Sequence, residues 1–372
     1  MVTVRVKITE QRDASYDIHI GRGLLAELSE LVGHACPAAR YAVITDSHVG
    51  KVYGVQVVAR LRDGRRPAEL FEFPAGEWNK TRETWAALSD RMLARQFGRD
   101  CAVIALGGGV VGDVAGFVAA TYLRGVPYVQ VPTSLLAMID SAIGGKTGVD
   151  VPAGKNLLGA FHQPGLVVAD LDVLASLPAA QLAAGMAEAV KHGVIADAAY
   201  FGFLEGEHRA VLARDAGVLE RVVARSVQIK ADVVAADERE AGRRATLNFG
   251  HTVGHAIEAT SKFAVLHGEA VAIGMAYEAR LAEALEIAER GTGERIRGAL
   301  ERYGLPLELP DPAAVQALLT AMQVDKKARA GTLRFALPRA IGSMHGGVPM
   351  GWTVAAPEEM VRQVLRGDRS PS

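Results

Sequence analysis

The sequence predicts an N-terminal α/β nucleotide-binding domain with a mostly parallel sheet, followed by an all-helical C-terminal domain. In the first half, short β-branched runs alternate with helical stretches, and from Pro178 onward long amphipathic segments take over. A chain of 372 residues also suits two domains better than one. We therefore place the α/β domain at residues 1–178 and the helical domain at residues 179–368.

The elements of the first half follow the rhythm of βαβ units. Short apolar and β-branched runs predict strands at Thr3–Lys7, Ala42–Thr45, Ala102–Leu106, Val126–Val131 and Leu166–Asp170. Helical periodicity between them predicts helices at Thr81–Gln96 and Val114–Leu123. In the second half, the amphipathic pattern predicts longer helices at Gln181–Val194, Val218–Ala236 and Gly268–Ile287.

Composition narrows the class of protein. Hydrophobic residues make up 49% and charged residues 22%, which supplies two cores and argues against disorder. The formal net charge of -1 offers no field for nucleic acid or an anionic membrane. The first residues do not resemble a signal peptide, and no apolar run reaches the ~18 residues of a membrane span. The only two cysteines, Cys36 and Cys101, are far apart in the sequence. We expect a soluble, cytoplasmic protein without disulfides.

Three histidines lie within seventeen residues, at His251, His255 and His267. The first two are four apart, so both imidazoles project from one face of a helix. Imidazole binds transition metals and titrates near neutrality, so the cluster indicates a metal site, a proton-transfer site, or both. A polar helix face is the plain alternative, but the flanking residues are small and apolar, as in a buried helix.

Glycine-rich turns suggest a nucleotide site. Residues 107–113, GGGVVGD, contain a G-x-G-x-x-G directly after a predicted strand, where backbone amides and a helix N-terminus can meet a pyrophosphate. The strand at Val126–Val131 ends in Pro132-Thr133, so it lacks the acidic residue that usually holds the ribose. Asp46, at the end of an earlier strand, is the better ribose candidate. A second glycine loop at residues 74–80 is either a ribose and phosphate contact or a solvated turn.

A dense polar run spans residues 140–147, DSAIGGKT, and GKN follows at 154–156. Lysines set among glycines and apolar residues offer point-charge contacts for phosphate or carboxylate. Further cationic and amide donors lie at Lys191, Lys230, Arg244, Asn248, Lys326 and Lys327. Each alone is more often a solvated charge than a ligand. Together they indicate a site for one metal, one nucleotide and a strongly anionic small molecule.

Several long motifs, in this order, resemble the 3-dehydroquinate synthases of the sugar-phosphate cyclase superfamily. The resemblance runs nearly from end to end, and its most specific parts are QVPTSLLAMIDSAIGGKTG at 130–148, MAEAVKHG at 186–193 and RATLNFGHTVGHAIE at 244–258. It implies an NAD-binding domain, a helical domain and an active site in the cleft between them. Ser134 and Ala142 depart from the family's usual Thr and Ser, which are small changes.

The resemblance also implies roles for individual residues. It assigns the metal, zinc or cobalt, to Glu188, His251 and His267, and leaves His255 for substrate and proton handling, whereas spacing alone suggested His251 and His255 as the metal pair. The implied NAD contacts are Asp46, Gly76, Glu77, Lys80, Gly109, Val110, Val111, Gly112, Asp113, Thr133, Ser134, Lys146 and Lys155. The implied catalytic and substrate contacts are Arg124, Asp140, Lys146, Lys155, Asn156, Lys191, Lys230, Arg244, Asn248, His255 and one or both of Lys326 and Lys327.

The implied reaction converts 3-deoxy-D-arabino-heptulosonate 7-phosphate to 3-dehydroquinate and phosphate, in the shikimate pathway. NAD takes a hydride and returns it within one turnover, phosphate leaves by β-elimination, and an intramolecular aldol step closes the ring. Three alternatives stay open: another cyclase of the superfamily (inosose, valiolone or amino-dehydroquinate type), a metal-dependent alcohol dehydrogenase, and an inactive nucleotide-binding module. We also expect a homodimer, with a sugar phosphate as its only partner.

Overall fold

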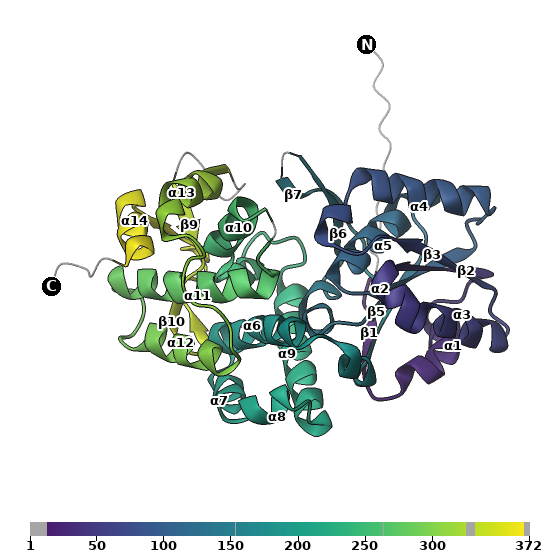
Figure 1. Cartoon of the computed structure of the whole chain (residues 1–372), viewed down its shortest axis with the longest axis horizontal. Helices are drawn as coiled ribbons and strands as arrows, with labels where there is room; N and C mark the ends of the chain where they lie inside the picture. Colours follow the sequence, from purple (N-terminus) through teal and green to yellow (C-terminus); the bar gives the residue numbers. More distant parts are fainter. Residues whose placement is uncertain (1–12, 153, 263, 325–331, 368–372) are drawn as a thin grey trace, which may run out of the picture.

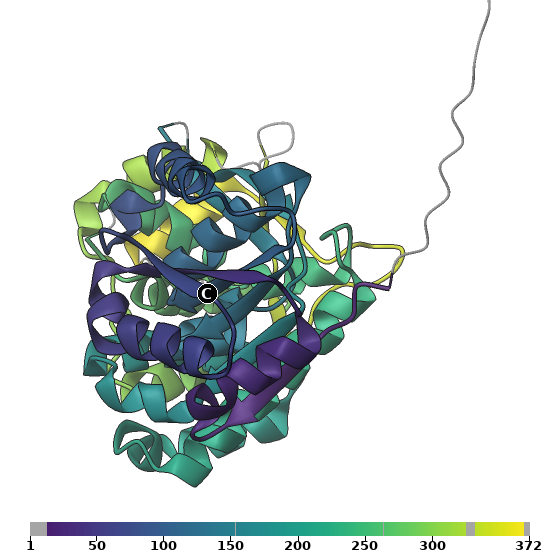
Figure 2. The same cartoon turned by 90° about the vertical axis from the view of Figure 1, so that its right-hand side faces the viewer.

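The computed structural model describes residues 13–152, 154–262, 264–324 and 332–367. Figure 1 shows two halves side by side, a sheet-containing half built from the first 170 or so residues and a mostly helical half built from the rest. Figure 2 turns the sheet-containing half toward the viewer, so that its helices are seen against the strands that they cover.

A six-stranded parallel sheet forms the first half. Its spatial order is β1 (Asp17–Gly21), β8 (Leu166–Asp170), β5 (Tyr128–Pro132), β4 (Cys101–Gly107), β2 (Arg40–Asp46) and β3 (Ala68–Phe73). From β2 the chain proceeds first to β3 on one side and then to β4 on the other, so the direction of winding reverses there. Parallel α/β sheets bind ligands outside the carboxyl ends of the strands at such a reversal. Asp46 and Gly107 are the last residues of the two strands that flank it.

Helices cover both faces of this sheet, which explains its nearly continuous hydrophobic strands. Along β2, Tyr41 and Val43 face one core, formed with α1 (Leu24–Ala35) and α3 (Val55–Asp63). The alternate residues Ala42 and Ile44 face the other core, formed with α4 (Arg82–Ala94) and α5 (Gly109–Thr121). The period of two along a strand therefore decides which helices each residue meets.

The predicted strands at 42–45, 102–106, 126–131 and 166–170 are confirmed to within two residues, and Thr3–Lys7 lies outside the described residues. The sequence prediction missed β1 and β3. It also began the helix after β4 too late, because α5 starts at Gly109, inside the glycine motif. The predicted polar run of residues 140–156 is a short helix (Ala137–Ser141) followed by an antiparallel hairpin of β6 (Lys146–Val151) and β7 (Gly154–Phe161).

The second half is helical, as predicted. The three predicted helices are α6 (Ala179–Ala196), α9 (Ala216–Ala236) and α11 (His267–Ala284), which agree with the predicted ends to within three residues. The other α-helices of the described second half are α7 (Ala198–Gly206), α8 (His208–Leu212), α10 (His251–Thr260), α12 (Thr292–Arg302), α13 (Val315–Val324) and α14 (Glu358–Arg366). Two short antiparallel strand pairs, β9–β12 and β10–β11, were not predicted; their strands span Leu333–Phe335, Val354–Ala356, Pro338–Ala340 and Ser343–Met344.

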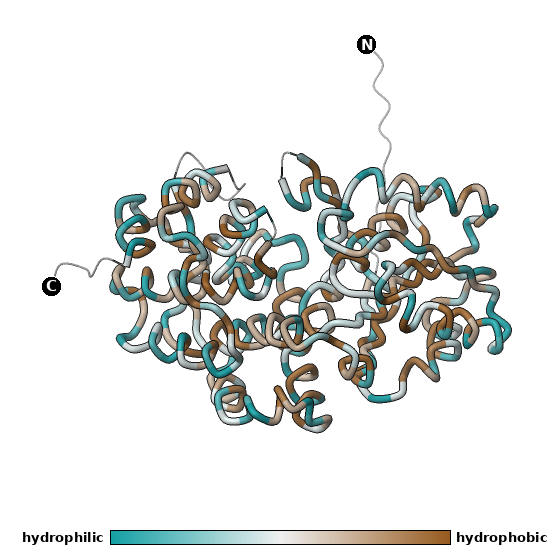
Figure 3. Tube along the Cα trace, viewed as in Figure 1, coloured by the Kyte–Doolittle hydropathy of each residue, from teal (hydrophilic) through white to brown (hydrophobic). Residues whose placement is uncertain are grey.

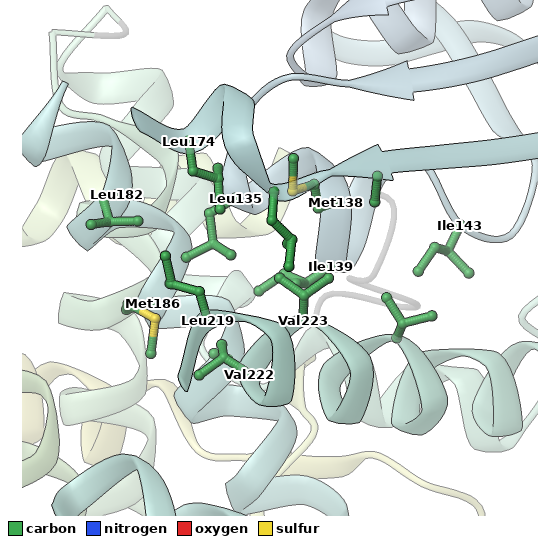
Figure 4. Close-up of a cluster of buried hydrophobic side chains, with 14 of the residues drawn as sticks. Leu135, Met138, Ile139, Ile143, Leu174, Leu182, Met186, Leu219, Val222 and Val223 are labelled. Atoms are coloured by element: carbon green, nitrogen blue, oxygen red, sulfur yellow. The ribbon is translucent and has the colours of Figure 1, made fainter. Parts of the chain in front are cut away.

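A continuous apolar cluster joins the two halves. Figure 4 shows Leu135, Met138 and Ile139 packed against Met186 of α6 and Val223 of α9. Figure 3 shows apolar segments mostly inside each half and polar segments mostly toward the periphery. This packing holds the segment after β5 against α6 and α9. Among the helices of the described ranges, none combines the length and apolarity of a membrane span.

Candidate active site

Three helices bring together the predicted metal ligands. Glu188 lies on α6, His251 at the start of α10 and His267 at the start of α11. Both histidine Nε2 atoms lie 3.5 Å from Glu188 Oε1, and the candidate ligand atoms all lie within 4.8 Å of one another. Glu188 is fully buried and His251 nearly so. A buried carboxylate and two imidazoles are a suitable donor set for a catalytic divalent metal.

Glycines allow these helices to approach so closely. A Cβ atom on Gly268, next to His267, would lie 1.9 Å from the carbonyl oxygen of Ala184 on α6. A Cβ atom on Gly274 of α11 would lie 1.9 Å from the carbonyl oxygen of Gly250, which precedes α10. Both distances are far below contact, so only glycine permits this packing. The ligand geometry therefore depends on glycines outside the ligand set.

The hydrogen bonds of both histidines prepare Nε2 for a metal. His251 Nδ1 lies 3.1 Å from the carbonyl oxygen of Phe249, and His267 Nδ1 lies 3.2 Å from Glu258 Oε1. Carbonyl and ionised carboxylate oxygens only accept hydrogen bonds, so Nδ1 carries the proton in each ring. Glu188 forms an ion pair with Lys191 through Oε2, and its Oε1 faces Nε2 of both histidines. These residues fit a divalent ion such as zinc or cobalt.

His255 has a different environment from the other two histidines. Its ring centroid lies 5.3 Å from that of His251 and 6.2 Å from that of His267. Its ligand-capable neighbours are Glu258 and His267, not Glu188. The shared helix face predicted from spacing is present, but the geometry does not group His251 and His255 around Glu188.

Charges around the metal ligands shift their pKa values in different directions. Burial, reinforced by Lys191, holds the pKa of His251 well below its usual range. Burial also disfavours the charged form of His267, but Glu258 and Glu188 outweigh it and raise the pKa of His267 to about 10. A divalent ion at Nε2 of His267 would therefore displace a proton.

A carboxylate and two ammonium groups adjoin the metal ligands. Lys230 Nζ lies 2.7 Å from Asp140 Oδ1 and 2.5 Å from the Asp140 carbonyl oxygen, and Lys191 Nζ lies 3.9 Å from the same Oδ1. Burial lowers the pKa of Lys230 despite Asp140, whereas Glu188 and Asp140 overcome burial and raise the pKa of Lys191. Both lysine side chains are almost fully buried. The pair is suited to an anionic group of a bound molecule.

Arg244 and Asn248 lie in the turn before α10. The guanidinium donates from Nη1 to the Glu238 carbonyl oxygen and from Nη2 to the Gly144 carbonyl oxygen, 3.0 Å away. Its Nε has no hydrogen-bond partner in the described part of the chain. Asn248 Nδ2 donates to Glu240 Oε1 at 2.7 Å, and the other oxygen of that carboxylate pairs with Lys146.

The remaining NAD-side residues lie near the carboxyl edge of the sheet. Lys80 Nζ contacts Asp113 Oδ2 at 2.6 Å and Asn156 Oδ1 at 2.5 Å. Lys155 Nζ lies 3.0 Å from both Glu77 Oε1 and Glu258 Oε1. Lys155 therefore links the loop after β3 to the helix that carries His251.

Asp46 ends β2 and accepts hydrogen bonds from the amides of His48 and Val49. The following predicted NAD contacts occupy the loop after β3, the first turn of α5 and the turn after β5: Gly76, Gly109, Val110, Val111, Gly112, Thr133 and Ser134. Asp46 and the start of α5 thus flank the winding reversal of the sheet.

Three predicted residues have no contact with this cluster that the described part of the chain shows, and two of them lie outside that part. Arg124 is exposed in the turn after α5, and no hydrogen bond or ion pair links it to the cluster within the described ranges. Lys326 and Lys327 lie outside the described residues.

Sequence reasoning missed four buried or half-buried groups at this site. Glu240 bridges Lys146 and Asn248, and Glu258 contacts Lys155 and His267. Glu278 accepts from the amides of Gly250 and Val253, at the start of α10. His192 is fully buried, 3.8 Å from Asp140 Oδ1. Two of these had a sequence signal. Glu258 lies seven residues after His251, and His192 lies four residues after Glu188, so each shares a helix face with a predicted metal ligand.

Solved structures with a similar architecture include two synthases that have NAD+ and a metal ion bound. A 2-deoxy-scyllo-inosose synthase complexed with carbaglucose-6-phosphate, NAD+ and Co2+ superposes with a TM-score of 0.86 at 26% identity, covering 95% of this chain and 96% of that one. The 2-epi-5-epi-valiolone synthase ValA from Streptomyces hygroscopicus, with NAD+ and Zn2+ bound, gives a TM-score of 0.85 at 30% identity, covering 97% and 98%. A probable glycerol dehydrogenase from Sinorhizobium meliloti shares the fold, with a TM-score of 0.66 at 18% identity, covering 95% of this chain and 96% of that one.

Family models narrow the class further. The 3-dehydroquinate synthase N-terminal model matches residues 70–184, and the C-terminal model matches residues 185–328. The 3-dehydroquinate synthase of Caulobacter vibrioides is 49% identical over 91% of this chain and 93% of its own length. That of Symbiobacterium thermophilum is 51% identical over 88% of this chain and 92% of its own length. The chain belongs to the 3-dehydroquinate synthase family.

Proposed function

We propose that this chain converts 3-deoxy-D-arabino-heptulosonate 7-phosphate to 3-dehydroquinate and phosphate, with NAD and one zinc or cobalt ion. The observation that carries the proposal is the Glu188, His251 and His267 triad, whose histidines already direct Nε2 inward, next to the Asp140, Lys191 and Lys230 cluster. Identity of about half the residues to relatives of that name supports the choice of reaction.

The two cofactors supply chemistry that the side chains lack. NAD can accept a hydride and return it within one turnover, and a divalent metal can bind vicinal oxygens of the substrate and stabilise negative charge there. We assign Glu188, His251 and His267 to the metal. We assign Asp46, the start of α5 and the loop at 74–80 to NAD. Asp46 and α5 flank the winding reversal of the sheet, and the loop follows β3, the strand next to β2.

The chain's own residues position an anionic substrate and move its protons. Lys191 and Lys230 offer ammonium groups to the phosphate, and their shared contact with Asp140 fixes where those groups lie. Arg244, with Asn248 nearby, is suited to the substrate carboxylate. His255 lies beside two metal ligands, so one of its ring nitrogens can exchange a proton with a substrate oxygen bound there.

The two halves of the chain bind different groups in this proposal. Residues 1–178 hold NAD and residues 179–368 hold the metal and most of the substrate, while Asp140 and Lys155 reach from the first half into the second. A homodimer in the cytoplasm stays a prediction, and sedimentation equilibrium of the purified chain checks the dimer.

The decisive experiment incubates the purified protein with the heptulosonate phosphate, zinc or cobalt, and NAD well below the substrate concentration. We expect phosphate and dehydroquinate in equal amounts, and no net NADH. One NADH formed per product would favour a dehydrogenase instead. Faster turnover of an aminated analogue of the substrate would move the chain to amino-dehydroquinate synthesis.

A further inference from the structure

Glu258 is a buried carboxylate at the site that the proposed reaction does not use. It lies on α10, two turns beyond His251, and is 2% exposed. Its Oε1 is 3.2 Å from His267 Nδ1 and 3.0 Å from Lys155 Nζ. Its Oε2 has no hydrogen-bond partner in the described ranges. Burying an ionised carboxylate is costly, so its place behind a metal ligand calls for an explanation.

The geometry connects Glu258 to Glu188 through one imidazole ring. His267 contacts Glu258 through Nδ1 and faces Glu188 through Nε2, 3.5 Å from Oε1. A carboxylate that accepts the Nδ1 proton fixes the tautomer and the ring orientation, and it makes Nε2 a stronger donor to a metal. The other histidine ligand has a neutral partner in this place, the carbonyl oxygen of Phe249. The two ligands therefore differ in how strongly they are polarised.

Lys155 shares the carboxylate with His267. Its ammonium lies 3.0 Å from Glu258 Oε1 and 3.0 Å from Glu77 Oε1, so it draws charge away from the imidazole. The same ammonium argues against a second cation held by His255, Glu258 and His267, because that ion would lie beside a fixed positive charge.

We propose that Glu258 is a positioning residue that presents Nε2 of His267 to the divalent metal, and that Lys155 moderates this effect. The inference rests on the proposed assignment of the metal to Glu188, His251 and His267. It differs from a plain ion-pair role, in which Glu258 would matter only because it neutralises Lys155.

Metal affinity of the whole chain tests the proposal without turnover. Chelator-treated protein is titrated with Zn2+ or Co2+ against a chromophoric chelator, and the visible absorption of bound Co2+ is recorded. Glu258→Gln should weaken metal binding about 10–100-fold and change the Co2+ spectrum, because the amide keeps the shape but lacks the charge. Lys155→Met should leave metal affinity unchanged or raise it, since it removes a competing cation. If Glu258→Gln does not fold, Glu258→Asp, which retracts the charge by one methylene, should weaken binding about 10-fold.

Two further variants separate the possible failures. Glu283→Gln changes a carboxylate near the opposite end of α11, where Oε1 accepts from the Gly293 amide, and should not change metal affinity. His251→Ala should lose the metal, and retention of tight binding there would show that the metal assignment itself is wrong. If His251→Ala loses the metal while the folded Glu258 variant stays within about threefold of the unsubstituted chain, the role of Glu258 is refuted. Equal weakening in Lys155→Met and Glu258→Gln would also overturn it, in favour of the plain ion pair.

Discussion

Arg244→Lys separates recognition of the substrate carboxylate from every other function of the site. The guanidinium is buried, with two of its five N–H groups donated to the carbonyl oxygens of Glu238 and Gly144. Three N–H groups remain, including Nε, and a planar fork can give two parallel hydrogen bonds to one carboxylate. A lysine cannot keep both carbonyl contacts and also make the paired contact with substrate.

The expected magnitudes follow from these contacts. One lost charge-assisted hydrogen bond is worth about 1.5–3 kcal/mol, which corresponds to roughly a 10- to 150-fold fall in kcat/KM for the heptulosonate phosphate. A buried carbonyl left without its donor should lower the free energy of unfolding by about 1–3 kcal/mol. NAD affinity should hardly change, because the hydrogen bonds of the Arg244 side chain to the described residues go to Glu238 and Gly144, and neither is a predicted nucleotide contact.

Steady-state kinetics of phosphate release, denaturant unfolding and NAD titration measure the three effects. Arg243→Lys is the matched control, because Arg243 is the residue before Arg244 and its side chain is exposed. The kcat/KM of this variant should stay within about twofold of the unsubstituted value. Sedoheptulose 7-phosphate and glucose 6-phosphate, which lack the carboxylate, should be poor substrates. The reasoning is wrong if either is cyclised faster than the heptulosonate phosphate, or if Arg244→Lys retains full kcat/KM.

Four other changes have defined outcomes. Chelation should abolish turnover and zinc or cobalt should restore it; full activity in protein shown by elemental analysis to be metal-free would contradict the metal's role. Gly268→Ala should destabilise the fold by about 1–3 kcal/mol or more in thermal unfolding, because its Cβ would strike the Ala184 carbonyl, whereas Gly298→Ala, with open space around it, should stabilise by about 0.5–1 kcal/mol. Asp46→Ala should weaken NAD binding by about 1–3 kcal/mol in a fluorescence titration, and an unchanged affinity would exclude Asp46 from the nucleotide site. Burial opposes the charge of Asp237, but hydrogen bonds from three backbone amides outweigh burial and lower the pKa of this carboxyl. The ionised carboxylate therefore stabilises the fold above the unfolded pKa of about 3.9, and this stabilisation is lost as pH falls through the folded pKa. Urea unfolding of Asp237→Asn should therefore differ from the unsubstituted chain at neutral pH and converge with it below about pH 4, and a constant difference would count against this reading.

The periodicity of apolar residues and the positions of turn residues were enough to predict most of the fold. The buried strands β2, β4, β5 and β8 are apolar runs bounded by turn residues, and α6, α9 and α11 are long segments with helical periodicity. The missed strands have weaker signals. β1 is the short segment DIHIG, and β3 is AELFEF, whose two glutamates lower its apparent strand character. Parallel pairing with β8 and β2 places them in the sheet, which is tertiary information that the local sequence lacks.

The start of α5 shows a conflict between propensity and tertiary context. Gly109, Val110, Val111 and Gly112 are poor helix formers, and the helix predicted from the sequence begins only at Val114. In the structure this stretch is the first helical turn, and a Cβ on Gly112 would lie 2.9 Å from Gln130 Oε1 on the adjacent strand. Close packing of helix against sheet therefore favours glycine here even though glycine weakens the helix.

Residue spacing alone could predict the site only where its chemistry is local in sequence, and the distant members came from the family resemblance. His251 and His255 have a visible spacing, and Glu188 and Lys191 are three apart on one helix, where they form an ion pair. The carboxylates behind these residues are distant along the chain from what they control: Glu278 accepts from the amide of Gly250, twenty-eight residues earlier, and Glu258 pairs with Lys155 across one hundred and three residues. A carboxylate on an amphipathic helix has the same pattern whether it faces water or a metal ligand. The close packing of α11 against α6 and α10, which glycines permit, decides which of the two it faces. The sequence can therefore place Glu258 on the helix face of His251, but only the folded backbone shows that it contacts His267.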